Sequence, residues 1–166
     1  MNVEFINPFI TATVNVMTTM AFLTPERGKP QLKSNEIQTG ADISGVIGIA
    51  DGANGWVAIG LSKQLALKLT ENMLGVKKQY IDADVRDATG EIVNMIAGGA
   101  KAELAQKGYT FKIAIPTVVV GDNHELGQMK GCNYIVIPFV ADGCEFFVSV
   151  CIEAEKAEKS SGIEKV

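Results

Sequence analysis

A carboxylate and an amide stand one helical turn apart in residues 84–107, which read DVRDATGEIVNMIAGGAKAELAQK. At about 100° per residue, Asp87, Glu91 and Asn94 fall within roughly 60° of one another on a helix. A carboxylate accepts hydrogen bonds from a cation, and an amide donates and accepts at once, so this pair can hold a partner and a water molecule. The pair has too few ligands for a metal ion, and no His or Cys is placed to assist a nucleophile. These residues could therefore assist a reaction by positioning a partner and a water molecule.

The helix that would carry this pair has an apolar stripe on its opposite side, at the spacing typical of a buried face. The stripe consists of Val85, Ala88, Ile92, Ile96 and Gly99. Gly98 follows Asn94 by one turn on the polar face, and the two adjacent glycines leave room for another backbone or a partner to come close. The alternative is an ordinary charged face that serves only solubility.

Composition excludes several classes of protein. The chain has 166 residues, of which 47% are apolar, and this fits one domain with a proper core. A net charge of −4, without a cluster of basic and aromatic residues, excludes a typical nucleic-acid surface. No apolar stretch is long enough to span a bilayer, and we expect no membrane insertion.

The cysteines and the first residues bear on the compartment. MNVEFINPF has no basic region followed by an apolar run, so no signal peptide is predicted. Cys132, Cys144 and Cys151 lack the spacing of metal ligands, and their odd number fits buried thiols better than disulfides. We expect a cytoplasmic protein with no metal of its own.

The rest of the chain alternates between helical and extended patterns. A first helix is predicted from Asn7-Pro8 to about Phe22, because Asn is a good N-cap and Pro is tolerated at the first helical position. A second helix is predicted from Ser62 to Gly75. Strands are predicted at 31–39, 43–49, 56–60, 110–119, 132–140 and 144–152. Pro116 lies inside the strand predicted at 110–119, so this strand should lie at an edge of the sheet or contain a bulge. Residues 120–130, which contain the only histidine, His124, are predicted to form a solvated loop.

An internal repeat is predicted from this order of elements. Ala50-Asp51-Gly52 and Ala141-Asp142-Gly143 each join two apolar strands, and each hairpin follows a helix with an asparagine. We expect an α+β fold of two pseudo-symmetric helix–strand–strand–strand halves, with a mainly antiparallel sheet of about six strands packed by about three helices. The expected domain is 1–153, with repeats at about 5–61 and 83–153, a joining helix at 62–75 and a charged flexible tail at 154–166. When Asn15 is aligned with Asn94, Ala12 stands opposite Glu91.

The pattern Asp87-x3-Glu91-x2-Asn94, with Pro116 in the next strand, resembles the phosphatase signature of the CheC/CheX/FliY family of bacterial chemotaxis proteins. Asn7-Pro8-Phe9, the two-copy organisation and the length look like CheX or a stand-alone CheC-like protein. The resemblance covers about residues 1–153. CheC-type members carry two Glu/Asn sites, and Ala12 departs from that pattern, so the single-site CheX type is the closer match.

The resemblance implies a protein aspartyl-phosphate phosphatase that acts on a phosphorylated CheY-like receiver domain. Asn94 would orient the attacking water, and Glu91 would pair with a receiver lysine. Asp87, Gly98 and Pro116 would support them. The partner would supply Mg²⁺, and this chain would need no cofactor.

Two further expectations accompany this one. The resemblance implies a homodimer, since the open edges of a sheet invite pairing with a second chain. The competing function is a non-catalytic scaffold or adaptor that binds the receiver, as in the flagellar rotor domains of the FliM type, which look similar in fold.

Overall fold

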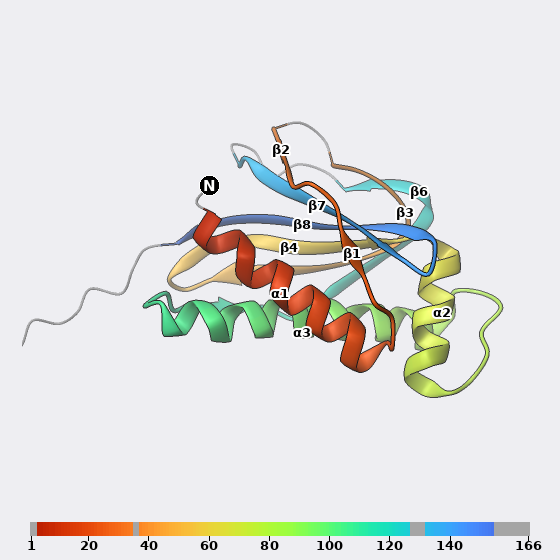
Figure 1. Ribbon diagram of the computed structural model, residues 1–166. Coiled ribbons are helices and arrows are strands. Elements are labelled where there is room, and N and C mark those ends of the chain that lie inside the picture. Colours follow the sequence, from red (N-terminus) through yellow and green to blue (C-terminus); the bar gives the residue numbers. More distant parts are fainter. Residues whose placement is uncertain (1–2, 35–36, 127–131, 155–166) are drawn as a thin grey trace, which may run out of the picture.

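The computed structural model describes residues 3–34, 37–126 and 132–154. Within these ranges, three helices accompany one antiparallel sheet of eight strands (Figure 1). The helices are α1 (Val3–Met20), α2 (Lys63–Leu74) and α3 (Ala83–Gln106). The strands are β1 (Glu26–Arg27), β2 (Gln31–Lys33), β3 (Ile37–Ala50), β4 (Ala53–Leu61), β5 (Lys112–Ile113), β6 (Thr117–Leu126), β7 (Tyr134–Ala141) and β8 (Cys144–Ala154). The predicted α+β class is confirmed, but the predicted number of about six strands is wrong. β1 has no counterpart among the predicted strands, and the strand predicted at 110–119 is divided into β5 and β6.

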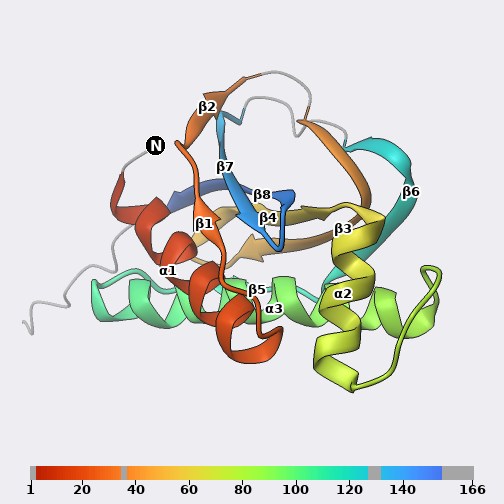
Figure 2. The same cartoon turned by 45° about the vertical axis from the view of Figure 1, so that its right-hand side comes forward.

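The order of the strands is symmetric about the central pair of β4 and β8. The sheet runs β1-β7-β8-β4-β3-β5, with β2 also on β7 and β6 also on β3. Exchanging the two halves of the chain leaves this order unchanged, and α1 and α3 lie next to each other on one face of the sheet (Figures 1 and 2). The repeat boundaries at 5–61 and 83–153 stay a prediction. Ala154 belongs to β8, and the remainder of the expected tail lies outside the described residues.

A β-bulge interrupts the strand predicted at 110–119. The register on its two sides is set by Ala114, whose N–H donates to the oxygen of Gly48 at 2.9 Å, and by the pairing of Thr117 with Val46. Ile115 and Pro116 therefore lie opposite the single residue Ile47, as in a β-bulge. Pro has no N–H for the ladder, and β5 and β6 pair with β3 alone, so the predicted edge position and the predicted bulge are both confirmed.

Helix α1 begins at Val3, so the predicted start at Asn7-Pro8 is wrong. Pro8 lies inside the helix and is buried. Tertiary contacts stabilise the helical turn before Pro8, and helix propensities read from the sequence do not take such contacts into account. The Phe5 and Tyr109 rings pack edge to face with centroids 4.8 Å apart, and the Tyr109 hydroxyl lies 3.3 Å from a carboxylate oxygen of Glu4.

Strand β6 extends to Leu126, so the loop predicted at 120–130 is wrong as far as the structure describes it. His124 lies in this strand rather than in a solvated loop. Its Nδ1 lies 2.8 Å from the oxygen of Gly121, and its Nε2 lies 2.8 Å from the hydroxyl of Ser44 on β3. An edge strand can be polar because one of its faces stays in water, and this explains why β6 resembled a loop in the sequence.

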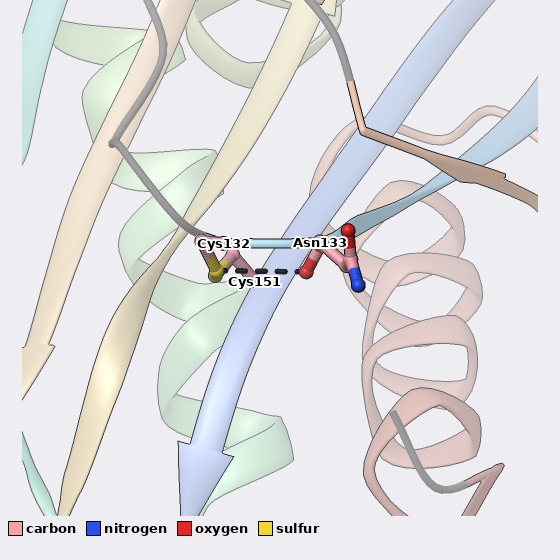
Figure 3. Close-up of a disulfide and its surroundings, with 3 residues drawn as sticks. All are labelled: Cys132, Asn133 and Cys151. Carbon is pink, nitrogen blue, oxygen red and sulfur yellow. Dashed lines mark hydrogen bonds between the residues drawn. A yellow bond between two sulfur atoms is a disulfide. The ribbon is translucent and has the colours of Figure 1, made fainter.

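A second, smaller core lies on the face of the sheet opposite α1 and α3. It contains Trp56, Ala58, Tyr134 and Cys151, and the Trp56 and Tyr134 rings pack with centroids 5.6 Å apart. A disulfide joins Cys132 to Cys151 across this core (Figure 3), so the expectation of unpaired thiols is wrong for these two cysteines. The pairing of Ile135 with Val150 brings the cysteines together, with their Cα atoms 6.5 Å apart. This proximity depends on strand register, which spacing along the chain did not reveal.

Candidate functional site

Helix α3 begins at a well-defined N-cap. The Asp82 carboxylate accepts the N–H of Val85 at 3.0 Å, which satisfies one of the free donors of the first turn. The Lys78 ammonium pairs with both Asp82 and Asp84, and its hydrogen bond holds the pKa of the Asp82 carboxyl below its ordinary value. Because Asp82 makes the cap, Asp87 lies a turn inside the helix. The helix predicted at 84–107 is confirmed within one residue at each end.

The buried face of α3 is the predicted stripe. Val85, Ile92 and Ile96 are 0% exposed, and Ala88 is 6% exposed. The helix also packs closely on β3, because a Cβ placed on Gly45 would lie 2.9 Å from the Cγ1 of Val93. This packing fixes the rotation of α3 on the sheet and therefore fixes which side chains face outward.

Gly99 is the one member of the stripe that is exposed. It lies at the contact with α1, where a Cβ on Gly99 would come within 3.1 Å of the Cβ of Ala12. A side chain here would push the two helices apart. The predicted role of this glycine, close approach of another backbone, is confirmed for α1.

Glu91 and Asp87 are exposed on the outer face of α3, and Asn94 beside them is half-buried. No residue that the structure describes makes a hydrogen bond or an ion pair with the side chain of Glu91 or of Asn94. A Cβ on Gly98 would meet no atom within 4 Å, so the surface one turn beyond Asn94 is open. The three predicted polar residues therefore share one accessible face, and their hydrogen-bonding capacity is available to a partner.

Pro116 lies beside this face rather than on it. A Cβ on Gly90 would be 3.4 Å from the Cγ2 of Val118 and 3.9 Å from the Cγ of Pro116. The bulge therefore packs against α3 one turn before Asn94. Pro116 can support the helix but has no group that could take part in hydrogen-bond chemistry.

The first half of the chain lacks the acid. Asn15 is exposed on α1, but Ala12, at the position that corresponds to Glu91, is 6% exposed and faces Gly99. A carboxylate at residue 12 would lie at the junction of the two helices instead of in water. The sequence alignment and the packing thus agree that a carboxylate–amide pair is present on α3 and not on α1.

Two other kinds of site receive no support from the described residues. No group of three or more His, Cys, Asp or Glu side chains among them is arranged to hold a metal ion, and Asp122, His124 and Glu125 do not form such a group. None of the helices in the described ranges combines the length and the apolar character that a membrane span requires.

The fold and this helix face define a class: α+β proteins of pseudo-symmetric topology that present a carboxylate and an amide from a helix packed on the sheet. The family model described as chemotaxis phosphatase CheX matches residues 43–140. The chain belongs to the CheX family.

Individual relatives agree with this assignment. The CheY-P phosphatase CheX of Thermotoga maritima is 30% identical over 122 residues, which are 73% of this chain and 78% of the relative. A CheC-like superfamily protein from Shewanella sp. PV-4 superposes with a TM-score of 0.86 at 39% identity, covering 93% of this chain and all of that chain. A chain of the CheX–CheY–BeF3–Mg²⁺ complex from Borrelia burgdorferi gives a TM-score of 0.76 at 27% identity, covering 92% of this chain and 99% of that chain. The expected CheC-like fold is confirmed.

Proposed function

We propose that this protein hydrolyses the aspartyl phosphate of a phosphorylated CheY-like receiver domain. Membership of the CheX family supports a phosphatase, and the relative from Thermotoga maritima is a CheY-P phosphatase. The complex of CheX with CheY from Borrelia burgdorferi supports a receiver as the partner. The observation that carries the proposal is the exposed Glu91 beside the half-buried Asn94, both without a hydrogen-bond partner among the described residues, on one face of a closely packed helix.

In this proposal Asn94 positions the attacking water. Its side chain would donate to and accept from the water, which attacks phosphorus in line with the aspartyl oxygen. The P–O bond to the aspartate breaks, inorganic phosphate leaves and the receiver carboxylate is regenerated. Positioning and charge stabilisation provide most of the catalysis in phosphoryl transfer, so this chain needs no covalent intermediate.

Glu91 would fix the register of the complex. Its carboxylate would accept a charge-assisted hydrogen bond from a receiver lysine, which places Asn94 over the phosphoryl group. The receiver would contribute the Mg²⁺ that neutralises the phosphoryl oxygens, and this chain would bring no cofactor. Asp87 and the open surface at Gly98 would line the same contact.

The direct test is the decay of a purified phospho-receiver with and without this protein. We expect catalytic amounts of the protein to accelerate release of inorganic phosphate. If the protein bound the phospho-receiver but left its lifetime unchanged, the non-catalytic scaffold of the FliM type would be the correct function.

The absence of an acid on α1 predicts one working site per chain. Asn15→Ala should leave phosphatase activity within a few-fold of the unmodified protein, because Ala12 provides no carboxylate beside Asn15. The rate of phosphate release at equal protein concentration measures this. Loss of activity in a variant whose circular dichroism is unchanged would show that α1 carries a second site.

We also propose that the protein is a homodimer. The outer strands at both ends of the sheet, β1 and β2 at one and β5 and β6 at the other, have unpaired edges among the described residues, and such edges favour association with a second chain. Light scattering at tens of micromolar should give twice the mass of the chain. A monomer mass at that concentration would contradict this proposal.

A further inference from the structure

We propose that Ile115 is an apolar docking residue, which contacts the receiver beside the phosphoryl group and sets the affinity of the complex. This inference rests on the proposed function. It concerns a side chain that the polar pattern on α3 did not single out, and it assigns that side chain to binding rather than to the chemical step.

Ile115 has an unusual exposure for its type. Its side chain is 88% exposed, whereas most of the isoleucines whose burial the structure describes lie in the core. The bulge accounts for this exposure, because it places Ile115 and Pro116 opposite one residue of β3 and leaves the extra residue outside the regular alternation of the strand. Pro116 packs towards Gly90, and Ile115 points into water.

The position of Ile115 relative to the polar pair follows from chain direction. After α3 ends, the chain turns back at Gly108, which has a φ of +90°, and returns along the helix through β5 towards β6. Val118 and Pro116 lie beside Gly90, so Ile115, which precedes them, lies further towards the C-terminal end of α3. Ile115 is therefore nearer than Pro116 to the turn of α3 that carries Asn94. Figures 1 and 2 both show β6 meeting α3 in the N-terminal half of the helix.

The other half of the chain provides an internal comparison. The N–H of Gly28 donates to the oxygen of Pro138 at 2.7 Å, and Gln31 pairs with Val136. Lys29 and Pro30 therefore lie opposite the single residue Ile137, in the same kind of bulge before the same kind of proline. The half with the carboxylate–amide pair presents an isoleucine at this bulge, and the half without the pair presents a lysine.

The occupant that this surface would take is the phospho-receiver of the proposed function, with an apolar side chain opposite Ile115. Glu91 and Asn94 offer hydrogen bonds, which are weak while water competes for them. An apolar side chain packed against the receiver beside them would exclude water from the contact, strengthen both interactions and add its own buried area to the affinity. Ile115 is placed for this role because it is exposed on the segment that packs against α3 one turn before Asn94.

The test separates binding from catalysis. Ile115→Lys copies the residue of the other half, and Ile115→Ala removes most of the side chain without adding charge. Both should raise KM for the phospho-receiver about tenfold, the effect of losing one well-packed interface side chain, with kcat within about twofold. Ile115→Leu should restore KM, and Lys29→Ile, the matched control at the other bulge, should leave KM unchanged.

Titration of each variant with a receiver in which beryllofluoride and Mg²⁺ mimic the phosphorylated form gives the affinity independently of turnover. An unchanged KM and Kd in Ile115→Lys and Ile115→Ala would overturn the inference. So would a fall in kcat alone, or an equal loss in Lys29→Ile. If the unmodified protein did not accelerate phosphate release, the proposed function would fail, and the Kd values would still decide whether Ile115 contacts the receiver.

Discussion

Asn94→Ala is expected to lower kcat for the phospho-receiver by on the order of 10²-fold or more, as the loss of comparable positioning groups does. Asn94 acts on the water that attacks phosphorus, and that contribution is largest in the transition state. A group used only there affects turnover and leaves ground-state binding nearly intact. Single-turnover decay of the phospho-receiver measures the rate, and titration with a beryllofluoride-bound receiver should give an unchanged Kd.

The local structure makes this substitution a clean one. Asn94 is half-buried on the outer face of α3 and has no hydrogen-bond partner among the described residues, so alanine removes no hydrogen bond within the chain. Alanine is also the best helix former, and α3 should remain folded, as circular dichroism would show. If the variant kept full activity, the water would have to be positioned by another group, and the role proposed for Asn94 would be wrong.

Glu91→Ala is expected to weaken receiver binding and turnover together. The proposed contact with a lysine exists in the bound ground state as well as in the transition state. Losing one member of a charged pair at a desolvated interface costs roughly 2–5 kcal/mol. Kd should therefore rise and kcat/KM should fall, whereas Asn94→Ala should change the rate alone.

Two comparisons sharpen the Glu91 result. Glu91→Gln keeps the shape and removes the charge, so it should resemble Glu91→Ala if the pairing is ionic. Asp87→Ala, one turn away on the same exposed face, should have the smaller effect. If Glu91→Ala and Asn94→Ala both kept full activity, this face of α3 would be an ordinary solvated surface, and the scaffold function would replace the phosphatase.

The parts of the structure that depend on local pattern could be predicted from the sequence. Helix α3 repeats its apolar residues with helical periodicity, and its polar pair points outward because Val85, Ile92 and Ile96 point inward. The hairpins at Asp51-Gly52 and Asp142-Gly143 follow from turn chemistry, and the structure places Asp51 and Asp142 at φ of 56° and 51°.

The parts that depend on strand register could not be predicted. The Cys132–Cys151 disulfide, the strand that carries His124 and the outward direction of Ile115 are all set by which residues pair across the sheet. The start of α1 is a related case, since packing of Phe5 against Tyr109 outweighs the proline after it. Tertiary contacts of this kind have no signal in a single sequence.

The exchange of outer strands between the two halves makes the chain one folding unit. β1 and β2 pair with β7, and β5 and β6 pair with β3, so each half supplies an outer strand to the other's hairpin. Neither half can complete its sheet before the whole chain is present, because Glu26 must find Val140 at the opposite end of the sequence. Contacts so distant in sequence raise the contact order and slow folding. They also explain why the half without an acid is indispensable. That half supplies the strands and the helix surface against which α3 packs, and this packing turns Glu91 and Asn94 outward.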